Sequence, residues 1–332
     1  MAEATPKPFR WGILGCARVA RNHWIGALRA TGGARLDALA SRDMAKARSW
    51  ADEFGVPRAY GDYDDLLADG DLDAILIVLP SALHAPWVLR ALAAGKHVLC
   101  DKPLATSAAA ARGLAQAADQ AGRLLGEGFV YPYHPQYDLI ARWLSEGRIG
   151  PLRLIRVGFT IALDRPGDFR FDPALGGGAL LDLGCYCVSL IRRLAQTAVR
   201  SVSASSRRRA AGVDLATAAV LELDNQITAV FDCALDCRGE QFLQLAGPVG
   251  RITADCPFRV NPGARLTLHT ASGTDVQELR PVNQYAACID GWQQRLARDL
   301  ITPSPAWDAA DTLAVLDAVA QSAATGRTVT LS

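Results

Sequence analysis

The sequence predicts an α/β protein in which an N-terminal, doubly wound parallel sheet precedes a C-terminal α+β domain with a large, mainly antiparallel open sheet. Three observations predict this class. The chain has 332 residues, more than one typical core holds. Short apolar runs alternate with amphipathic helices in its first part, as in βαβ units. Later runs follow one another across turn residues, so we place the domains at residues 1–128 and 129–332.

The parallel sheet is predicted from short buried runs that are separated by helices. The expected strands are Phe9–Leu14, Arg35–Ala40, Asp73–Leu79, Lys96–Cys100 and Leu124–Glu127. The expected helices are Arg18–Ala30, Asp43–Phe54, Ala82–Ala94 and Ser107–Ala121. Connections of this length join parallel strands and cover both faces of the sheet with helices.

The second domain is predicted from short runs between turn residues, which are typical of an antiparallel meander. The expected strands are Leu152–Ile161, Thr217–Leu223, Ile227–Ala234, Phe242–Ala246 and Arg265–His269. The expected helices are Pro135–Glu146, Ala179–Ala195, Tyr285–Leu300 and Ala309–Ala323.

Composition argues against several classes of partner. A net charge of +1 produces no field that would attract nucleic acid or a membrane surface. The basic run Arg207–Arg209 is interpreted as the solvated end of a strand. The segment Met1–Pro8 lacks the apolar stretch of a secretory signal, and apolar runs such as Ala74–Leu79 are too short to cross a bilayer. The eight cysteines lack the paired spacing of a zinc site, so we expect no metal and free thiols in a reducing cytoplasm.

The turn after the first strand matches a dinucleotide-binding fingerprint. It reads Gly15-Cys16-Ala17-Arg18-Val19-Ala20. In that fingerprint the first glycine permits the turn, the second lets the backbone approach a pyrophosphate, and the third small residue lets helix and strand pack. Ala17 stands where glycine is usual. Because the turn directly follows the first strand of a βαβ series, we predict a Rossmann domain that binds a dinucleotide here.

The end of the second strand indicates which dinucleotide binds. An NAD enzyme places an acidic residue there for the ribose hydroxyls, whereas this chain has Ser41 and Arg42. A hydroxyl and a guanidinium suit a 2′-phosphate, so we predict NADP. The alternative is that both residues simply cap the helix that starts at Asp43.

Two further strand ends carry residues that could bind a ligand or take part in catalysis. The run Leu79–His84 follows the third expected strand, and Asp101-Lys102-Pro103 follows the fourth. Ligands of open α/β sheets bind at this edge. Lys102 can hold a carbonyl oxygen or lower the pKa of a neighbouring acid there, although a plain surface lysine is the alternative. We assign the following residues to the cofactor site: Leu79, Pro80, His84 and Asp101.

A glycine run precedes the expected helix Ala179–Ala195. Gly176–Gly178 would let the backbone approach a ligand closely. Asp182 and Tyr186 are four residues apart, so both project from one face of the helix. A half-buried core tyrosine is the plainer interpretation of Tyr186.

Together these motifs resemble the glucose–fructose oxidoreductase (GFO/IDH/MocA) family over essentially the whole chain. The resemblance rests on the Gly-Cys-Ala turn, Pro80 with His84, Asp101-Lys102-Pro103, and the glycine run that leads to Asp182 and Tyr186. It implies that Lys102 and Tyr186 form the catalytic pair. Most members have histidine at the second position. The tyrosine is similar to a subgroup that includes dihydrodiol dehydrogenase and the dTDP-sugar C-3 ketoreductases of deoxysugar (kijanose-type) antibiotic biosynthesis. Asp101 departs from the glutamate that is more common in the family.

The resemblance implies NADPH-dependent reduction of a keto group, at C-3, of a dTDP-linked keto-deoxysugar. Tyr186 would protonate the developing alkoxide with help from the ammonium of Lys102, or Lys102 would donate the proton while Tyr186 orients the sugar. Asp182 would accept a hydrogen bond from a sugar hydroxyl. A dehydrogenase of a free sugar, anhydrosugar or cyclic diol is the enzymatic alternative, and a non-catalytic NADP(H) sensor is the alternative from another class.

The diphosphate and base of such a substrate require partners of their own. We expect Arg165 and Arg170, in the loop before the glycine run, to bind the diphosphate and Tyr131 to stack on the base. The open face of an antiparallel sheet is prone to association, and the family uses it to form dimers or tetramers. We therefore expect a homo-oligomer.

Overall fold

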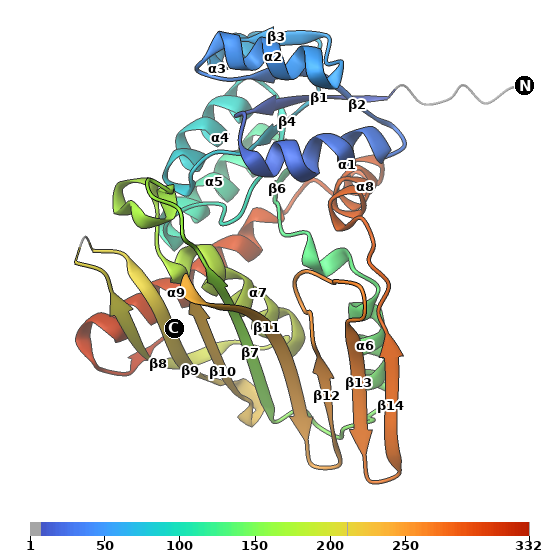
Figure 1. Cartoon of the computed structure of the whole chain (residues 1–332), viewed down its shortest axis with the longest axis vertical. Coiled ribbons are helices and arrows are strands. Elements are labelled where there is room, and N and C mark those ends of the chain that lie inside the picture. The colour runs from blue at the N-terminus through green and yellow to red at the C-terminus, as the bar shows by residue number, and fades with distance from the viewer. Residues whose placement is uncertain (1–7, 211, 332) are drawn as a thin grey trace, which may run out of the picture. The chain divides into compact units, whose positions relative to one another are not determined.

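The computed structural model describes residues 8–210 and 212–331 and divides into two compact units (Figure 1). Unit 1 comprises Met1–Ala105, Ala109–Val130 and Asn283–Ala310, and unit 2 comprises Thr106–Ala108, Tyr131–Val282 and Asp311–Ser332. Residues 1–7, which form most of the segment in which we expect no secretory signal, lie outside the described residues.

Unit 1 contains a six-stranded parallel sheet with the strand order β3-β2-β1-β4-β5-β6. Its strands are β1 (Phe9–Leu14), β2 (Ala34–Ala40), β3 (Arg58–Tyr60), β4 (Ala74–Ile77), β5 (His97–Cys100) and β6 (Leu125–Glu127). Its helices are a π-helical turn (Ala20–Trp24), α1 (Ile25–Ala30), α2 (Met44–Phe54), α3 (Tyr63–Ala68), α4 (His84–Ala93), α5 (Ala108–Ala121) and α8 (Gln284–Ala297). This order confirms the predicted doubly wound sheet, with the ligand-binding edge where the order reverses between β1 and β4.

Two elements of unit 1 were not predicted. The strand β3 has three residues, all partly buried, so it offers no apolar period to detect. The helix α3 has six residues and begins after Asp62, whose carboxylate accepts a hydrogen bond from the Asp64 amide. Segments this short depend on neighbouring elements for their stability, and hydrophobic periodicity alone does not reveal them.

The segment Asn283–Ala310 differs from the predicted boundary, which placed it in the second domain. Trp292 of α8 is 3% exposed, and its ring centroid lies 4.7 Å from that of Trp11 on β1 and 6.0 Å from that of Phe9. Aromatic side chains of this size dominate core energetics, so the packing of Trp292 anchors α8 in unit 1. Sequence order could not show that a distant helix completes the first core.

Unit 2 contains a nine-stranded sheet with the strand order β14-β13-β12-β11-β7-β10-β9-β8-β15. Its strands are β7 (Leu154–Ala162), β8 (Val199–Arg208), β9 (Asp214–Leu223), β10 (Thr228–Ala234), β11 (Asp236–Gly247), β12 (Gly250–Ala254), β13 (Arg265–Thr270), β14 (Gly273–Glu278) and β15 (Val329–Thr330). Its helices are α6 (Gln136–Ser145), a π-helical turn (Leu180–Gly184), α7 (Cys185–Ala195) and most of α9 (Ala306–Thr325), whose residues 306–310 belong to unit 1. β7 pairs in parallel with β10, and the neighbouring strands otherwise run antiparallel, which confirms the mainly antiparallel sheet.

The two faces of this sheet differ in character. Ile155, Val157 and Phe159 of β7 are buried on the face against which α7 packs (Figure 1). Arg156 alternates with them and is exposed, as the period of two in a strand requires. The sheet therefore has one face covered by helix and one open face.

The structure gives observations on three expectations from composition, which concern membrane spans, disulfides and metal sites. By length and composition alone, the helical stretch Pro173–Ala195 could cross a bilayer. We did not expect this, because we considered short apolar runs only. The apolar window of this stretch is 67% buried within the protein, as core helices commonly are, so it is weak support for a membrane span. Among the described residues, the cysteines form no disulfide and no group of three or more His, Cys, Asp or Glu could hold a metal.

Candidate functional site

The turn after β1 has the backbone geometry that the fingerprint requires. Gly15 has a φ of +111°, and an added Cβ would lie 2.6 Å from the carbonyl oxygen of Val78 at the end of β4. Any other residue would strain the turn and push it away from this strand end. In the rest of the turn Cys16 and Ala20 are buried, Ala17 and Val19 are partly buried, and Arg18 is exposed. The π-helical turn that starts at Ala20 follows directly, so a helix N-terminus opens beside the turn.

Cys16 contributes packing to the turn. Its Sγ donates to the carbonyl oxygen of Ala40 at 3.7 Å, and burial raises the pKa of the thiol to about 11. Cys16 is therefore a neutral thiol at neutral pH and is not a nucleophile.

The contacts at the end of β2 bear on whether Ser41 and Arg42 bind a phosphate or cap the following helix. The N-cap of α2 is Asp43, whose carboxylate accepts a hydrogen bond from the Lys46 amide at 3.2 Å. Ser41 is buried, and its Oγ accepts from the Asp43 amide at 3.2 Å. Arg42 is exposed and interacts with the hydroxyl of Tyr63. Because Asp43 caps the helix, capping does not explain Arg42, whose role in phosphate binding stays a prediction.

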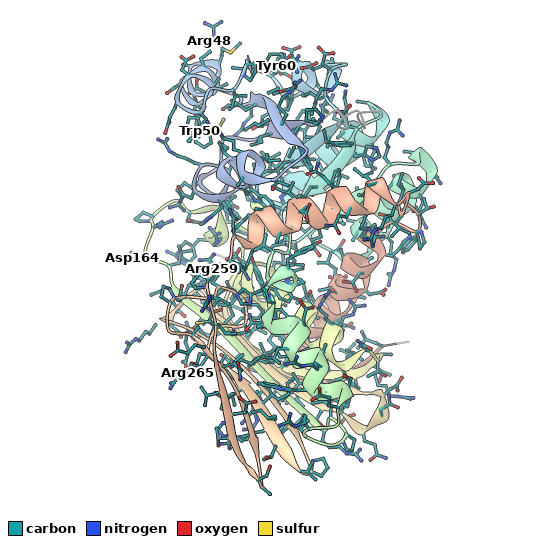
Figure 2. The ribbon with its side chains drawn as sticks, turned by 90° about the vertical axis from the view of Figure 1, so that its right-hand side faces the viewer. Arg48, Trp50, Tyr60, Asp164, Arg259 and Arg265 are labelled. Atoms are coloured by element: carbon teal, nitrogen blue, oxygen red, sulfur yellow. The ribbon has the colours of Figure 1, made fainter. Side chains whose placement is uncertain are left out.

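Lys46 is a residue that the sequence reasoning missed at this corner of unit 1. Its charge acts on Cys16 of the turn, and its Nζ lies 5.5 Å from the ring centroid of Trp50, which Figure 2 labels on α2. The guanidinium of Arg21 lies 5.6 Å from the same ring. The position of Lys46 in the first turn of the helix after Arg42 is the signal that could have identified it.

Replacing Arg42 by alanine is expected to raise the KM for NADPH about 10- to 100-fold and to leave the KM for NADH nearly unchanged. A charge-assisted hydrogen bond contributes about 1.5–3 kcal/mol, and NADH has no 2′-phosphate to lose it. Steady-state kinetics with both nucleotides measure this ratio. Arg48→Ala, which removes an exposed arginine of the following helix α2, is the control and should change neither KM. An equal effect of Arg42→Ala on both nucleotides would contradict phosphate recognition.

His84, which we expect at the cofactor site, lies buried between the ends of two strands. It is 1% exposed, with Nδ1 at 2.8 Å from the carbonyl oxygen of Pro103 and Nε2 at 2.8 Å from that of Leu79. Burial lowers the pKa of the imidazole. A neutral imidazole carries one N–H, so it donates to one of these two carbonyl oxygens, and its ring lies between the end of β4 and the end of β5. Leu79 and Pro80 themselves are partly buried beside it.

Lys102 lies on the loop that follows β5. Its amide donates to the carboxylate of Asp101 at 3.0 Å, and Pro103 follows through a cis peptide bond. Asp101 and Lys102 are both partly buried. On the far side of the loop, Glu127 of β6 accepts a hydrogen bond from the Leu104 amide at 2.8 Å. The sequence reasoning missed Glu127, because one acidic residue at the end of a short strand forms no motif.

In unit 2, we expected the glycine run to let the backbone approach a ligand, and the atoms that lie closest to Gly177 and Gly178 are protein atoms. A Cβ on Gly177 would overlap the carbonyl oxygen of Arg170. Gly178 has a φ of +119°, and a Cβ there would overlap Oδ1 of Asp214. Oδ2 of Asp214 accepts hydrogen bonds from the Leu180 amide at 2.7 Å and the Thr217 hydroxyl at 2.9 Å. Asp214, which the sequence reasoning missed, therefore anchors the start of the helical segment.

Two residues predicted to bind substrate contact each other. Nε of Arg170 donates to Oδ2 of Asp182 at 2.6 Å, and its Nη1 donates to Asp168 at 3.1 Å. Asp182 is buried and lies in the π-helical turn, so it does not share a regular α-helix with Tyr186. Arg165 is exposed in the preceding loop, close in sequence to Asp164, which Figure 2 labels. The ion pair fixes Asp182 in place and satisfies much of the charge of Arg170.

Tyr186 is partly buried in an aromatic cluster of unit 2. Its ring centroid lies 5.2 Å from that of Phe258, 5.4 Å from that of Phe159 and 6.1 Å from that of Tyr131. Tyr131 is fully buried, and its hydroxyl lies 2.8 Å from Oγ of Ser189. That burial favours a supporting role for Tyr131 over the predicted stacking on a base. Lys102 belongs to unit 1 and Tyr186 to unit 2.

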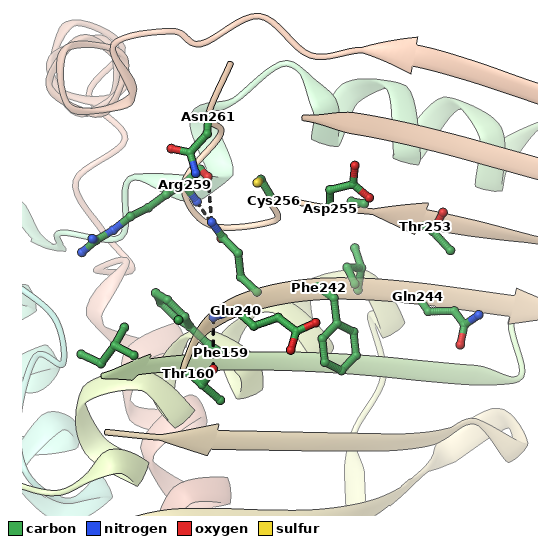
Figure 3. A pocket seen from close by; sticks show the side chains of 15 residues that line it. Phe159, Thr160, Glu240, Phe242, Gln244, Thr253, Asp255, Cys256, Arg259 and Asn261 are labelled. Atoms are coloured by element: carbon green, nitrogen blue, oxygen red, sulfur yellow. Dashed lines mark hydrogen bonds between the residues drawn. The ribbon is translucent and has the colours of Figure 1, made fainter. Parts of the chain in front are cut away.

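A hollow on the open face of the nine-stranded sheet has none of the predicted site residues in its lining (Figure 3). Its lining includes the side chain of Thr160 from β7 and, from β11, those of Glu240, Phe242 and Gln244. A Cβ on Gly158 would overlap the ring of Phe242, so the absence of a side chain at Gly158 makes room for that ring on the sheet. The hollow is thus a feature of the open face, and Phe159 of its lining also packs against Tyr186.

Two family models match this chain. One, described as an oxidoreductase family with an NAD-binding Rossmann fold (GFO_IDH_MocA), matches residues 9–129. The other, described as the GFO/IDH/MocA C-terminal domain, matches residues 137–253.

Named relatives and a solved structure resemble nearly the whole chain. The D-xylose 1-dehydrogenase (NADP(+)) 2 of Haloferax volcanii is 35% identical over 97% of this chain and 99% of its own length. The dTDP-3,4-didehydro-2,6-dideoxy-alpha-D-glucose 3-reductase of Streptomyces violaceoruber is 34% identical over 89% of this chain and 87% of its own. The crystal structure of KijD10, a 3-ketoreductase from Actinomadura kijaniata in complex with NADP and TDP-benzene, has a TM-score of 0.90 at 31% identity and covers 95% of this chain and 98% of its own.

Proposed function

This chain belongs to the GFO/IDH/MocA family of oxidoreductases and uses NADP, and on that premise we propose that it reduces the C-3 keto group of a dTDP-linked keto-deoxysugar in antibiotic sugar biosynthesis. One observation carries the proposal: a lysine follows β5 and a tyrosine lies on α7, in a chain similar throughout to named 3-ketoreductases. Lysine with tyrosine is a pairing suited to protonating an alkoxide.

The residues of unit 1 fit NADP. Gly15 leaves room for a closely approaching backbone. Arg42 follows the buried Ser41, and both Ser41 and the charge of Lys46 act on the Cys16 thiol, so the cations that a 2′-phosphate requires are available. When bound, NADPH supplies the hydride for the reduction.

The chain's own residues supply proton transfer and orientation. In our proposal Tyr186 donates a proton to the developing alkoxide, and the ammonium of Lys102 lowers the energy of the phenolate that remains. Lys102 as the donor, with Tyr186 orienting the sugar, is the second form of the same proposal. Asp182, held by Arg170, accepts a hydrogen bond from a sugar hydroxyl. Arg165 and Arg170 bind the diphosphate, with Arg165 the more exposed of the two.

A comparison of nucleotide-linked and unlinked substrates tests this function. We expect kcat/KM for a dTDP-linked 3-keto-deoxysugar to exceed that for the same sugar without the nucleotide by about 100-fold. Two charge-assisted contacts to the diphosphate at about 1.5 kcal/mol each account for that ratio. NADPH consumption reports both rates, with a dTDP-sugar that lacks a keto group as the control. Equal rates would assign the chain to free sugars instead.

A dehydrogenase of a free sugar, anhydrosugar or cyclic diol is the second candidate function. The similarity to the Haloferax D-xylose 1-dehydrogenase, over 97% of this chain, favours it. It uses the same Lys102 and Tyr186 and requires no contact from Arg165 or Arg170. Oxidation of D-xylose with NADP separates the two candidates. The alternative of a non-catalytic NADP(H) sensor has no support, because the chain belongs to an oxidoreductase family.

We also propose that the protein is a cytoplasmic homo-oligomer, a dimer or tetramer that associates through the open face of the nine-stranded sheet. The exposed side chain of Val220 and the ring of Phe242 over Gly158 provide apolar surface on that face. Covering an open sheet face by a second copy removes its tendency to associate without specificity.

A further inference from the structure

Glu127 lies beside the loop that carries Lys102 and has no place in the mechanism described above. We propose that Glu127 is a positioning residue for Lys102: its carboxyl group holds the Lys102 loop, and the charge of that group governs how firmly Lys102 keeps its proton. The inference rests on the proposed role of Lys102.

The contacts of Glu127 span the loop on both sides of Lys102. In the sheet register Glu127 of β6 pairs with Cys100 at the end of β5. The neighbouring Gly128 amide donates to the carbonyl oxygen of Cys100 at 2.6 Å. The carboxylate Oε1 accepts from the Leu104 amide at 2.8 Å. Residues 100 and 104 are thus tied to the neighbouring residues 128 and 127, and Lys102 lies midway between them in the sequence.

The titratable groups around Glu127 come from two elements. Asp101, Lys102 and the thiol of Cys100 face it from the end of β5, and Asp308 faces it from α9. Burial raises the pKa of Glu127 to about 8. The negative charges of Asp308 and Asp101 reinforce that rise, while the Leu104 amide and the ammonium of Lys102 oppose it. A carboxyl group in this environment exchanges its proton close to physiological pH.

The sign of the effect on Lys102 follows from this titration. Below about pH 8 the Glu127 carboxyl is neutral and holds the loop by its hydrogen bond alone. Above that pH it becomes negative, and a negative neighbour favours the ammonium form of Lys102. Lys102 therefore keeps its proton to a higher pH than it would beside a neutral group. A reduction that needs this proton gains activity at alkaline pH.

Glu127→Gln separates the charge from the hydrogen bond, because the amide oxygen still accepts from Leu104 but cannot ionise. We expect the alkaline limb of the pH profile of kcat/KM to move about one pH unit lower in this variant, the low end for neighbouring opposite charges. A merely structural role would change the rate at every pH and leave the limb in place, which would overturn the proposal. Glu146→Gln, at an exposed surface ion pair with Arg148, is the matched control and should leave the limb unchanged.

Carbon-13 NMR of glutamate-labelled wild-type protein gives a readout that does not depend on activity. The resonance missing from Glu127→Gln identifies Glu127, and its titration midpoint should lie well above the ordinary 4.5. Lys102→Ala should raise that midpoint further, because it removes a positive neighbour. A Glu127 midpoint near 4.5, or one that is the same in Lys102→Ala as in the wild type, overturns the inference even if Lys102 is essential. Full turnover by Lys102→Ala with a shifted midpoint would instead refute the proposed function and leave the coupling standing.

Discussion

Lys102→Ala is expected to lower kcat by about 10²–10⁴, the range that positioned acid–base groups contribute. The side chain lies on a loop held by His84 on one side and Glu127 on the other, so its removal should leave the loop backbone in place. Binding of NADPH, followed by quenching of tryptophan fluorescence, should change less than twofold. Stopped-flow reduction of the keto-sugar measures the loss. Turnover at the wild-type rate would remove Lys102 from the mechanism.

Tyr186→Phe shows which of the two residues gives the proton. Phenylalanine preserves the ring contacts with Phe159 and Phe258 and removes the hydroxyl alone. If Tyr186 is the donor, its loss should match that of Lys102→Ala, and the double variant should be little slower than either single one, as for residues that act as a unit. A loss of less than tenfold in Tyr186→Phe would assign the proton to Lys102.

Gly178→Ala is expected to reduce the free energy of unfolding by about 2–4 kcal/mol. The φ of +119° suits glycine alone, and the added Cβ would displace Asp214 from the Leu180 amide that it caps. Backbone strain of this kind costs about 1–3 kcal/mol, and a lost cap costs about 0.5–2 kcal/mol more. Urea denaturation followed by far-UV circular dichroism measures the change.

Gly167→Ala provides the matched control for Gly178→Ala. Gly167 also has a positive φ, of +75°, but an added Cβ there meets nothing within 4 Å. We expect a loss of about 1 kcal/mol from the backbone conformation alone. Equal losses for the two variants would mean that the contact between Gly178 and Asp214 contributes nothing to stability.

The local pattern of the sequence determined the parts of this protein that depend on neighbours in the chain. The strand Phe9–Leu14, the turn at Gly15 and the helix after it follow from burial, backbone freedom and helix initiation within a few residues. The same holds for Ser41 and Arg42, whose residue types at the end of a strand are enough to predict NADP. In unit 2 the strands β9, β10 and β13 were recognisable as short runs between turn residues.

Tertiary structure alone decided the contacts between segments far apart in the chain. Trp292 completes the core around Trp11, Asp214 anchors the helical segment after Gly178, and Glu127 closes the loop of Lys102. Arg170 and Asp182 could each be named from the sequence, but not that they form an ion pair. No local signal marks such partners, because burial and hydrogen bonding between distant segments depend on how the sheets bring them together. The chemical groups are thus readable along the chain, while their pairing and protonation depend on the folded packing.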